Sequence, residues 1–243
     1  MSEGQGQEIK LARVTGIALL SLIGSGIAGA VFVSHGIDIN LSADVTATAT
    51  AMLEAEQRLK AKAYLGCVGF GLDLLVSIGL YQLVRRQSPL LASWSLLMSA
   101  GSALLVFLGS VFAMNAAMLA GNSAFQTLAS SDERLLLTAI QATSDYTSFH
   151  LSLVLSSAAK AGFFFLLLKS GKVPSLLAGW GVFASLLVAT TMVARDFAPA
   201  LGHNAVTATF MLCNLIAIVG LGLFLTVRGI RLENPTSPVG AIS

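Results

Sequence analysis

The chain contains six apolar stretches that are each long enough, or nearly so, to cross a lipid bilayer. A helix needs about 20 apolar residues to cross a hydrocarbon layer about 30 Å thick, whereas the strands of a membrane barrel are short and alternate in polarity. Of the 243 residues, 55% are hydrophobic and only 11% are charged, which is too little polar surface for a soluble globule. The sequence therefore predicts an all-α bundle of six membrane-spanning helices. Their expected ranges are Val14–Val33, Ala63–Val84, Leu90–Leu119, Thr147–Leu168, Pro174–Ala194 and Asn204–Val227.

The basic residues predict how these helices are oriented. Lys and Arg near the ends of membrane helices are preferentially kept in the cytoplasm. Here they concentrate at alternate flanks, while the opposite flanks are net acidic. We therefore expect a multi-pass protein of the bacterial plasma membrane with its N-terminus and C-terminus in the cytoplasm. The basic residues behind this expectation are Lys10, Arg13, Arg85, Arg86, Lys169, Lys172, Arg228 and Arg231.

The two ends of the chain carry separate signals. The first apolar run follows basic residues and contains Ala28-Gly29-Ala30, a sequence that a signal peptidase could cleave. Because the run stays apolar through Val33, we expect a retained membrane helix. The C-terminal segment is short, polar and rich in proline. The sequence thus predicts one six-helix domain over residues 1–233 and a disordered tail over residues 234–243.

Two outer connections are long enough to contain further helix. Between Ser34 and Lys62, an Ala- and Thr-rich stretch with apolar residues at helical spacing predicts a short helix. This helix would lie at the membrane interface or extend the second span. Ser130-Ser131-Asp132-Glu133 fits the capping-box pattern. The fourth helix is therefore expected to begin outside the membrane, ahead of Thr147.

Asp73 and Lys160 are full charges in the middle of apolar spans. They lie roughly 15 and 20 Å inside their helices, where an uncompensated charge costs at least about 2.5–3.5 kcal/mol. Asn214 has a similar depth in the sixth helix, and Ser77 lies one turn from Asp73 on the same face. These four residues predict a polar site between helices two, four and six that binds a small solute or relays a proton. A static ion pair that locks the helices together is the alternative.

The three histidines, His35, His150 and His203, are all expected near the outer ends of their helices. Imidazoles at one depth on separate helices could ligate a metal ion or a haem iron, with Asp145 and Asp196 as ligands or hydrogen-bonded partners. No His-x-x-x-His or Glu-x-x-His spacing accompanies them. A metal or haem protein is therefore an alternative hypothesis, and no motif identifies a cofactor.

The segment from Ser170 to Gly181 reads Ser-Gly-Lys-Val-Pro-Ser-Leu-Leu-Ala-Gly-Trp-Gly. It resembles the start of the fifth helix in a bacterial membrane family, domain of unknown function 4386, in which a Ser, Ile-Pro-Arg and a Trp-Gly pair recur. The resemblance extends from Lys10–Gly16 to the helix that ends near Arg228, although Ser175 stands where the family usually has Arg. It implies a six-span membrane protein and carries no activity with it.

The chain lacks a clustered basic surface with stacking aromatic side chains, so nucleic acid is not an expected partner. The expected partners are the lipid bilayer and a small amphiphilic ligand, and no pattern predicts the oligomeric state. We expect a non-enzymatic membrane protein that binds a small amphiphile or solute, or an accessory subunit, with its site at Asp73 and Lys160. Two alternatives stay open. One is a membrane oxidoreductase or metal protein built on the three histidines, and the other is a proton- or solute-coupled carrier.

Overall fold

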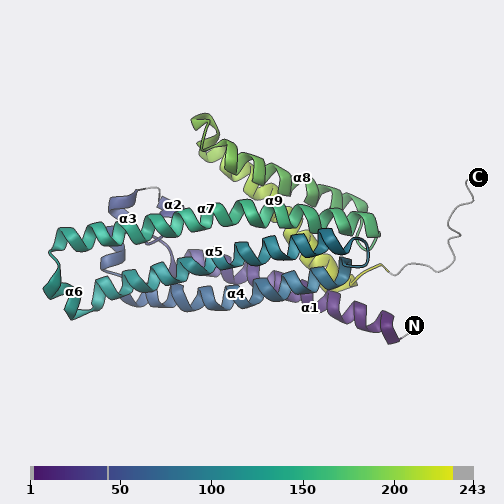
Figure 1. Ribbon diagram of the computed structural model, residues 1–243, viewed down its shortest axis with the longest axis horizontal. Coiled ribbons are helices and arrows are strands. Elements are labelled where there is room, and N and C mark those ends of the chain that lie inside the picture. The colour runs from purple at the N-terminus through teal and green to yellow at the C-terminus, as the bar shows by residue number, and fades with distance from the viewer. Residues whose placement is uncertain (1–2, 43, 232–243) are drawn as a thin grey trace, which may run out of the picture.

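The computed structural model describes residues 3–42 and 44–231, which form helices joined by short turns (Figure 1). Six of these helices are long and apolar enough to cross a membrane. The predicted all-α, six-span architecture is therefore confirmed, whereas the predicted tail over residues 234–243 lies outside the described residues. The long helices are α1 (Glu3–Ala28, continued by the π-helical turn η1, Gly29–Val33), α4 (Glu56–Val84), α5 (Pro89–Gly121), α7 (Ser131–Ser170), α8 (Ser175–Ala194) and α9 (Asn204–Arg228).

Short helices fill the connections. The predicted short helix between the first two spans is α3 (Val45–Leu53), and the second span is extended as well, because α4 begins already at Glu56. Asp44 caps α3 by accepting a hydrogen bond of 2.9 Å from the Ala47 amide. α3 then packs against α7. The other short elements are α2 (Ile39–Ser42), α6 (Ser123–Leu128) and the 3-10 turn η2 (Pro199–Gly202).

The six long helices form a ring in the order of the sequence. α1 packs against α4, α4 against α5, α5 against α7, α7 against α8, α8 against α9, and α9 closes the ring against α1. The closing seam is a backbone contact at Gly16. A β-carbon at this position would lie 2.6 Å from the Thr226 amide nitrogen and 2.8 Å from the Gly222 carbonyl oxygen. Small residues permit this close approach between membrane helices.

The two ends of the bundle are formed by different segments of the chain. The start of α1, the end of α9 and the turns after α4 and α7 gather at one end, which we call the terminal end (Figure 1). α3 and α6 lie at the opposite, distal end. α7 has 40 residues and is therefore roughly 60 Å long, about twice the thickness of the hydrocarbon layer. α7 is therefore longer than a helix needs to be to cross the membrane.

The start of α7 depends on the predicted capping box, which is formed. The Ser130 hydroxyl accepts a hydrogen bond from the Glu133 amide at 3.3 Å, and the Glu133 carboxylate accepts one from the Ser130 amide at 2.7 Å. We expect Ser130→Ala to destabilise the first turns of α7 by about 1 kcal/mol. Amide hydrogen exchange over residues 131–140 should therefore accelerate about fivefold. Ser131→Ala is the matched control, and equal exchange in the two variants would contradict the capping role.

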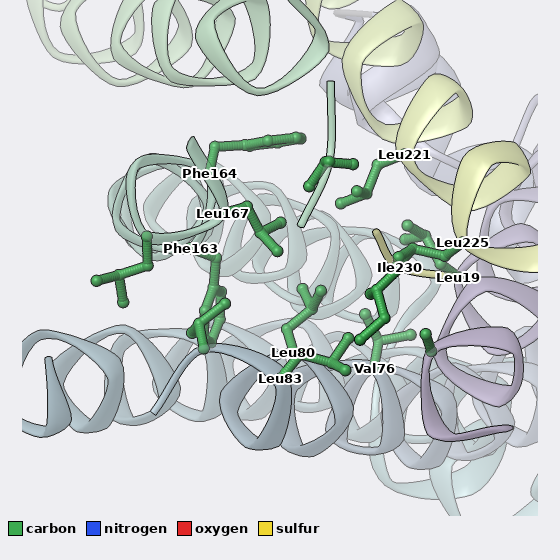
Figure 2. Packing of buried hydrophobic residues seen from close by; sticks show 14 of the residues in the cluster. Leu19, Val76, Leu80, Leu83, Phe163, Phe164, Leu167, Leu221, Leu225 and Ile230 are labelled. Carbon is green, nitrogen blue, oxygen red and sulfur yellow. The ribbon is translucent and has the colours of Figure 1, made fainter. Parts of the chain in front are cut away.

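Large apolar side chains fill the terminal half of the ring. Figure 2 shows side chains of α1, α4, α7 and α9 pointing into the space between these helices. Phe164 is 2% exposed, and Leu167 and Leu225 are fully buried. Dense packing of this kind leaves little room for water. We call this group the core cluster, and its main members are Leu19, Val76, Leu80, Leu83, Phe163, Phe164, Leu167, Leu221, Leu225 and Ile230.

Candidate functional site

Asp73 of α4 and Lys160 of α7 line the same cavity, which has a volume of about 400 Å³. The cavity lies inside the ring, and α1, α4, α5, α7 and α9 all contribute to its wall. Most of the wall is apolar. The serines that line it are Ser77, Ser99, Ser102, Ser152 and Ser156. We call this space the central cavity.

The two charges in the central cavity are not joined to each other. Within the described part of the chain, no ion pair of 4.0 Å or less links the Asp73 carboxylate to the Lys160 ammonium, and neither side chain takes part in a hydrogen bond. Their mid-helix positions place both charges far from either end of the bundle. A charge at such depth is costly unless a partner or water compensates it. The central cavity therefore contains two opposite charges that interact through space without a direct contact.

Serine hydrogen bonds hold the helices around the central cavity in register. The Ser77 hydroxyl donates to the Asp73 carbonyl at 2.8 Å and lies 2.7 Å from the Ser99 hydroxyl, which joins α4 to α5. The Ser102 hydroxyl donates to the Ser152 carbonyl at 2.9 Å, which joins α5 to α7. These bonds fix the three helices that contribute most of the polar wall.

Asn214, the fourth residue predicted for this site, lies outside the lining of the central cavity. It precedes Ile218, which does line the cavity, by one turn of α9. The Asn214 side chain is buried, and its Oδ1 atom has no hydrogen-bond partner. The structure thus brings Asp73, Ser77 and Lys160 together and leaves Asn214 one turn away. Their assignment as a binding site stays a prediction.

A second cavity of about 390 Å³ continues from the central cavity toward the distal end. The two share five lining residues, so they meet at the level of Asp73. We call the second space the distal cavity. It runs between α1, α4, α5 and α7 and reaches Lys62. The shared residues are Leu22, Gly26, Asp73, Val106 and Phe149.

Lys62 lies between two carboxylates in the wall of the distal cavity. Its ammonium is 2.6 Å from the Asp145 carboxylate of α7 and 3.2 Å from that of Asp38. All three side chains are only 15–16% exposed. Gly109 of α5 makes room for this group, because a β-carbon there would lie 2.2 Å from Asp145 Oδ1. We call Lys62, Asp38 and Asp145 the Lys62 triad, and it ties α4 to α7 and to the turn after η1.

Sequence reasoning missed the Lys62 triad as a unit. In the sequence, Lys62 marks only the end of the connection between the first two spans, and Asp145 is expected beside the histidines as a ligand or partner of a metal site. The only local signal is a cation placed at the very start of an apolar span, with Gly66 one turn further along. A signal of that kind is too common to identify partners.

The central cavity is closed toward the terminal end. Six members of the core cluster also line the cavity: Leu19, Val76, Leu80, Phe163, Phe164 and Leu221. Figure 2 shows these side chains in the space between α1, α4, α7 and α9. The distal cavity, which shares five lining residues with the central cavity, is a route into it from the opposite end.

The three histidines do not come together. His35 is exposed and lies in the turn after η1, and His203 is exposed and precedes α9. His150 is buried, and its Nε2 atom lies 3.0 Å from the Asp196 carboxylate. Among residues 3–42 and 44–231, no group of three or more His, Cys, Asp or Glu side chains is placed to hold a metal ion. Asp196 is thus a partner of His150 alone, and Asp145 belongs to the Lys62 triad.

Comparison with known proteins finds one matching family. No curated protein and no solved structure matches the chain. The family described as Domain of unknown function (DUF4386) matches residues 14–229. This range holds the six long helices, except for the first turns of α1, and every residue that lines the central and distal cavities. The chain therefore belongs to the DUF4386 family.

Proposed function

We propose that this multi-pass membrane protein binds a small amphiphile or zwitterionic solute in the central cavity, between Asp73 and Lys160. One observation carries the proposal: two opposite charges that make no direct contact with each other line one mostly apolar cavity deep in the bundle. A pair that served only to lock α4 to α7 would be expected to form a direct, hydrogen-bonded contact, because only such a contact repays the desolvation of both ions. Here both side chains instead line the central cavity.

The cavity wall limits the chemistry of the ligand. A volume of about 400 Å³ suits a small molecule rather than a polymer. The lining charges sum to zero, so a ligand that is neutral overall leaves no uncompensated charge behind. An anionic group would face Lys160, and a donor or cationic group would face Asp73. An apolar body would contact side chains such as Ile23 and Phe149.

The ligand would enter from the distal end, past the Lys62 triad. The triad lies where the distal cavity leaves the ring, and its three charges again include both signs. If both termini are cytoplasmic, as the basic flanks predict, the distal end faces away from the cytoplasm of the bacterial plasma membrane. The protein would then sample solutes or lipids from the outer side. The core cluster would prevent their passage to the terminal end.

Mass spectrometry of small molecules retained by the purified protein tests this proposal. Wild-type protein in nanodiscs is expected to retain one molecule per chain that denaturation releases. Asp73→Asn, Lys160→Met and the cavity-filling Ser156→Leu should each reduce that yield at least tenfold. Lys169→Met and Asp132→Asn remove exposed charges from α7, the helix that carries Ser156 and Lys160, and should leave the yield unchanged.

The double variant Asp73→Asn/Lys160→Met separates binding from stability. We expect it to recover the thermal stability that either single variant loses, because no buried charge is left without a counter-charge, and yet to retain no ligand. Recovery of both stability and the retained molecule would show that the two charges do not contact the ligand. That result, or an equal yield from all variants, would reject the proposal.

A further inference from the structure

A third cavity, of about 660 Å³ and separate from the other two, lies at the terminal end. Four segments that are distant in sequence meet there: the start of α1, the end of α4 with the following turn, the turn between α7 and α8, and the chain just after α9. We propose that this terminal cavity binds a phosphate group, presented by a lipid headgroup or by a soluble phosphate compound. The core cluster separates it from the central cavity, so the proposal does not depend on the proposed function.

The charges that line the terminal cavity are strongly unbalanced. Arg85, Arg86, Lys172 and Arg231 contribute four positive charges, and Glu8 contributes the single negative charge. The preference for basic residues on the cytoplasmic side accounts for their presence at this end of the bundle. This preference does not explain why the four basic side chains line one cavity, because separate helix ends could place them at any position around the ring. Basic pockets between membrane helices bind anionic headgroups.

Lys172 shows that the cavity is a built structure rather than a mobile surface. It is 9% exposed, and its ammonium donates to the Leu83 carbonyl at 3.0 Å and to the Glu8 carboxylate at 3.3 Å. The Arg231 amide in turn donates to the Lys172 carbonyl at 2.9 Å. Gly171 ends α7 in the left-handed conformation, with φ of 63°, and reverses the chain just before Lys172. Lys172 thus contacts all three of the other segments that form the terminal cavity.

Glu8 compensates only part of this charge. Its carboxylate lies 3.3 Å from both Lys172 and Arg86. In the described part of the chain, Arg85 and Arg231 form no ion pair, although both line the cavity. Guanidinium groups match phosphate oxygens with paired hydrogen bonds. An anion in the cavity would therefore be held mainly by these two arginines, in competition with Glu8.

The shape of the terminal cavity also suits a phosphate compound with an apolar part. Gln82 and Gln87 offer amide donors beside the arginines, and Leu11 and Leu83 supply apolar surface deeper in the cavity. A lipid headgroup with its glycerol, or a soluble phosphate ester, presents this combination. Both sources share the phosphate group, which is the part that the proposal specifies.

Binding of phosphatidylglycerol to full-length protein in phosphatidylcholine nanodiscs tests the inference. We expect wild type to bind it preferentially, and Arg85→Gln/Arg231→Gln to bind at least tenfold more weakly. Among residues 3–42 and 44–231 neither arginine is in an ion pair, so this variant should keep its thermal stability. The control Lys10→Gln/Arg13→Gln removes the same charge from exposed positions at the same end that do not line the cavity. It should bind like wild type.

Two further measurements define the ligand. Glu8→Gln should tighten phosphatidylglycerol binding, because it removes the competing carboxylate, and a general loss of structure cannot produce a gain. In lipid-free detergent, pyrophosphate should raise the thermal stability of wild type if the source is a soluble phosphate, and should have no effect if it is a headgroup. Equal lipid binding by wild type and both double variants, with no stabilisation by pyrophosphate, would overturn the proposal. Retention of a ligand in the central cavity is measured separately and is unaffected by either outcome.

Discussion

Replacing Lys62 by Met should lower the free energy of unfolding by about 3 kcal/mol, because it leaves two carboxylates close together and largely buried without their shared cation. Asp38 and Asp145 are each only 15–16% exposed, and both contact the Lys62 ammonium. Lys62 also joins α4 to α7 across the distal cavity, so its loss should loosen the mouth of that cavity. Thermal unfolding in detergent, followed by intrinsic fluorescence, measures the change.

Lys60→Met provides a matched control two residues earlier on the same helix. Lys60 forms an ion pair with Glu56, but the two side chains are 40% and 36% exposed, and exposed helical pairs contribute about 0.5 kcal/mol or less. A similar loss of stability in both variants would show that the Lys62 triad has no special role. Adding Asp145→Asn to Lys62→Met should recover part of the lost stability, since one unpaired carboxylate is then removed.

Gly16→Ala is expected to destabilise the protein by about 2–3 kcal/mol through overpacking of the seam between α1 and α9. The added β-carbon would lie 2.6 Å from the Thr226 amide nitrogen and 2.8 Å from the Gly222 carbonyl oxygen. Backbone atoms inside a helix cannot rotate away, so relief requires the two helices to separate. The expected readout is a lower thermal midpoint together with loss of ligand from the central cavity, because both helices line that cavity.

Gly24→Ala tests whether the effect belongs to the seam or to any glycine of α1. A β-carbon at Gly24 meets nothing within 4 Å, and the residue is exposed. Ala also restricts the unfolded chain more than Gly, so the stability should be unchanged or slightly higher. If Gly16→Ala is as stable as Gly24→Ala, the ring does not close through this contact.

Much of the fold follows from local signals in the sequence. Pro89 begins α5, the box at Ser130 begins α7, and Pro174 precedes α8. The lengths of the apolar runs predict the six spans. Backbone N–H and C=O groups in lipid must be hydrogen-bonded within the chain, so a long apolar run forms a helix. The order of the helices in the ring could not be predicted in the same way. It depends on contacts between faces, and the apolar residues of a membrane helix are distributed around its whole circumference.

The candidate site was predictable in part, for a similar reason. Asp73 and Lys160 stand out because a charge within an apolar run is costly whichever way the helix faces. Lys62 does not stand out, because it lies at the end of a span, where lysine is common. Its partners are also 24 and 83 positions away in the sequence. Asn214 lies four residues before Ile218 and so on the same face of α9. It is displaced from the cavity lining by one turn along the helix axis, and counting residues from the expected start of the span does not fix the depth of a side chain to within one turn.

The ring order has a consequence for how the protein is made. Each long helix packs against the one synthesised just before it, so every new helix leaving the translocon finds its partner already in the membrane. The exception is α1, whose seam with α9 forms only when the last helix arrives. Until then Gly16 lacks its contacts with Gly222 and Thr226, and the central cavity lacks the wall supplied by Ile218 and Leu221. The cavity is therefore completed only when the last helix has been made.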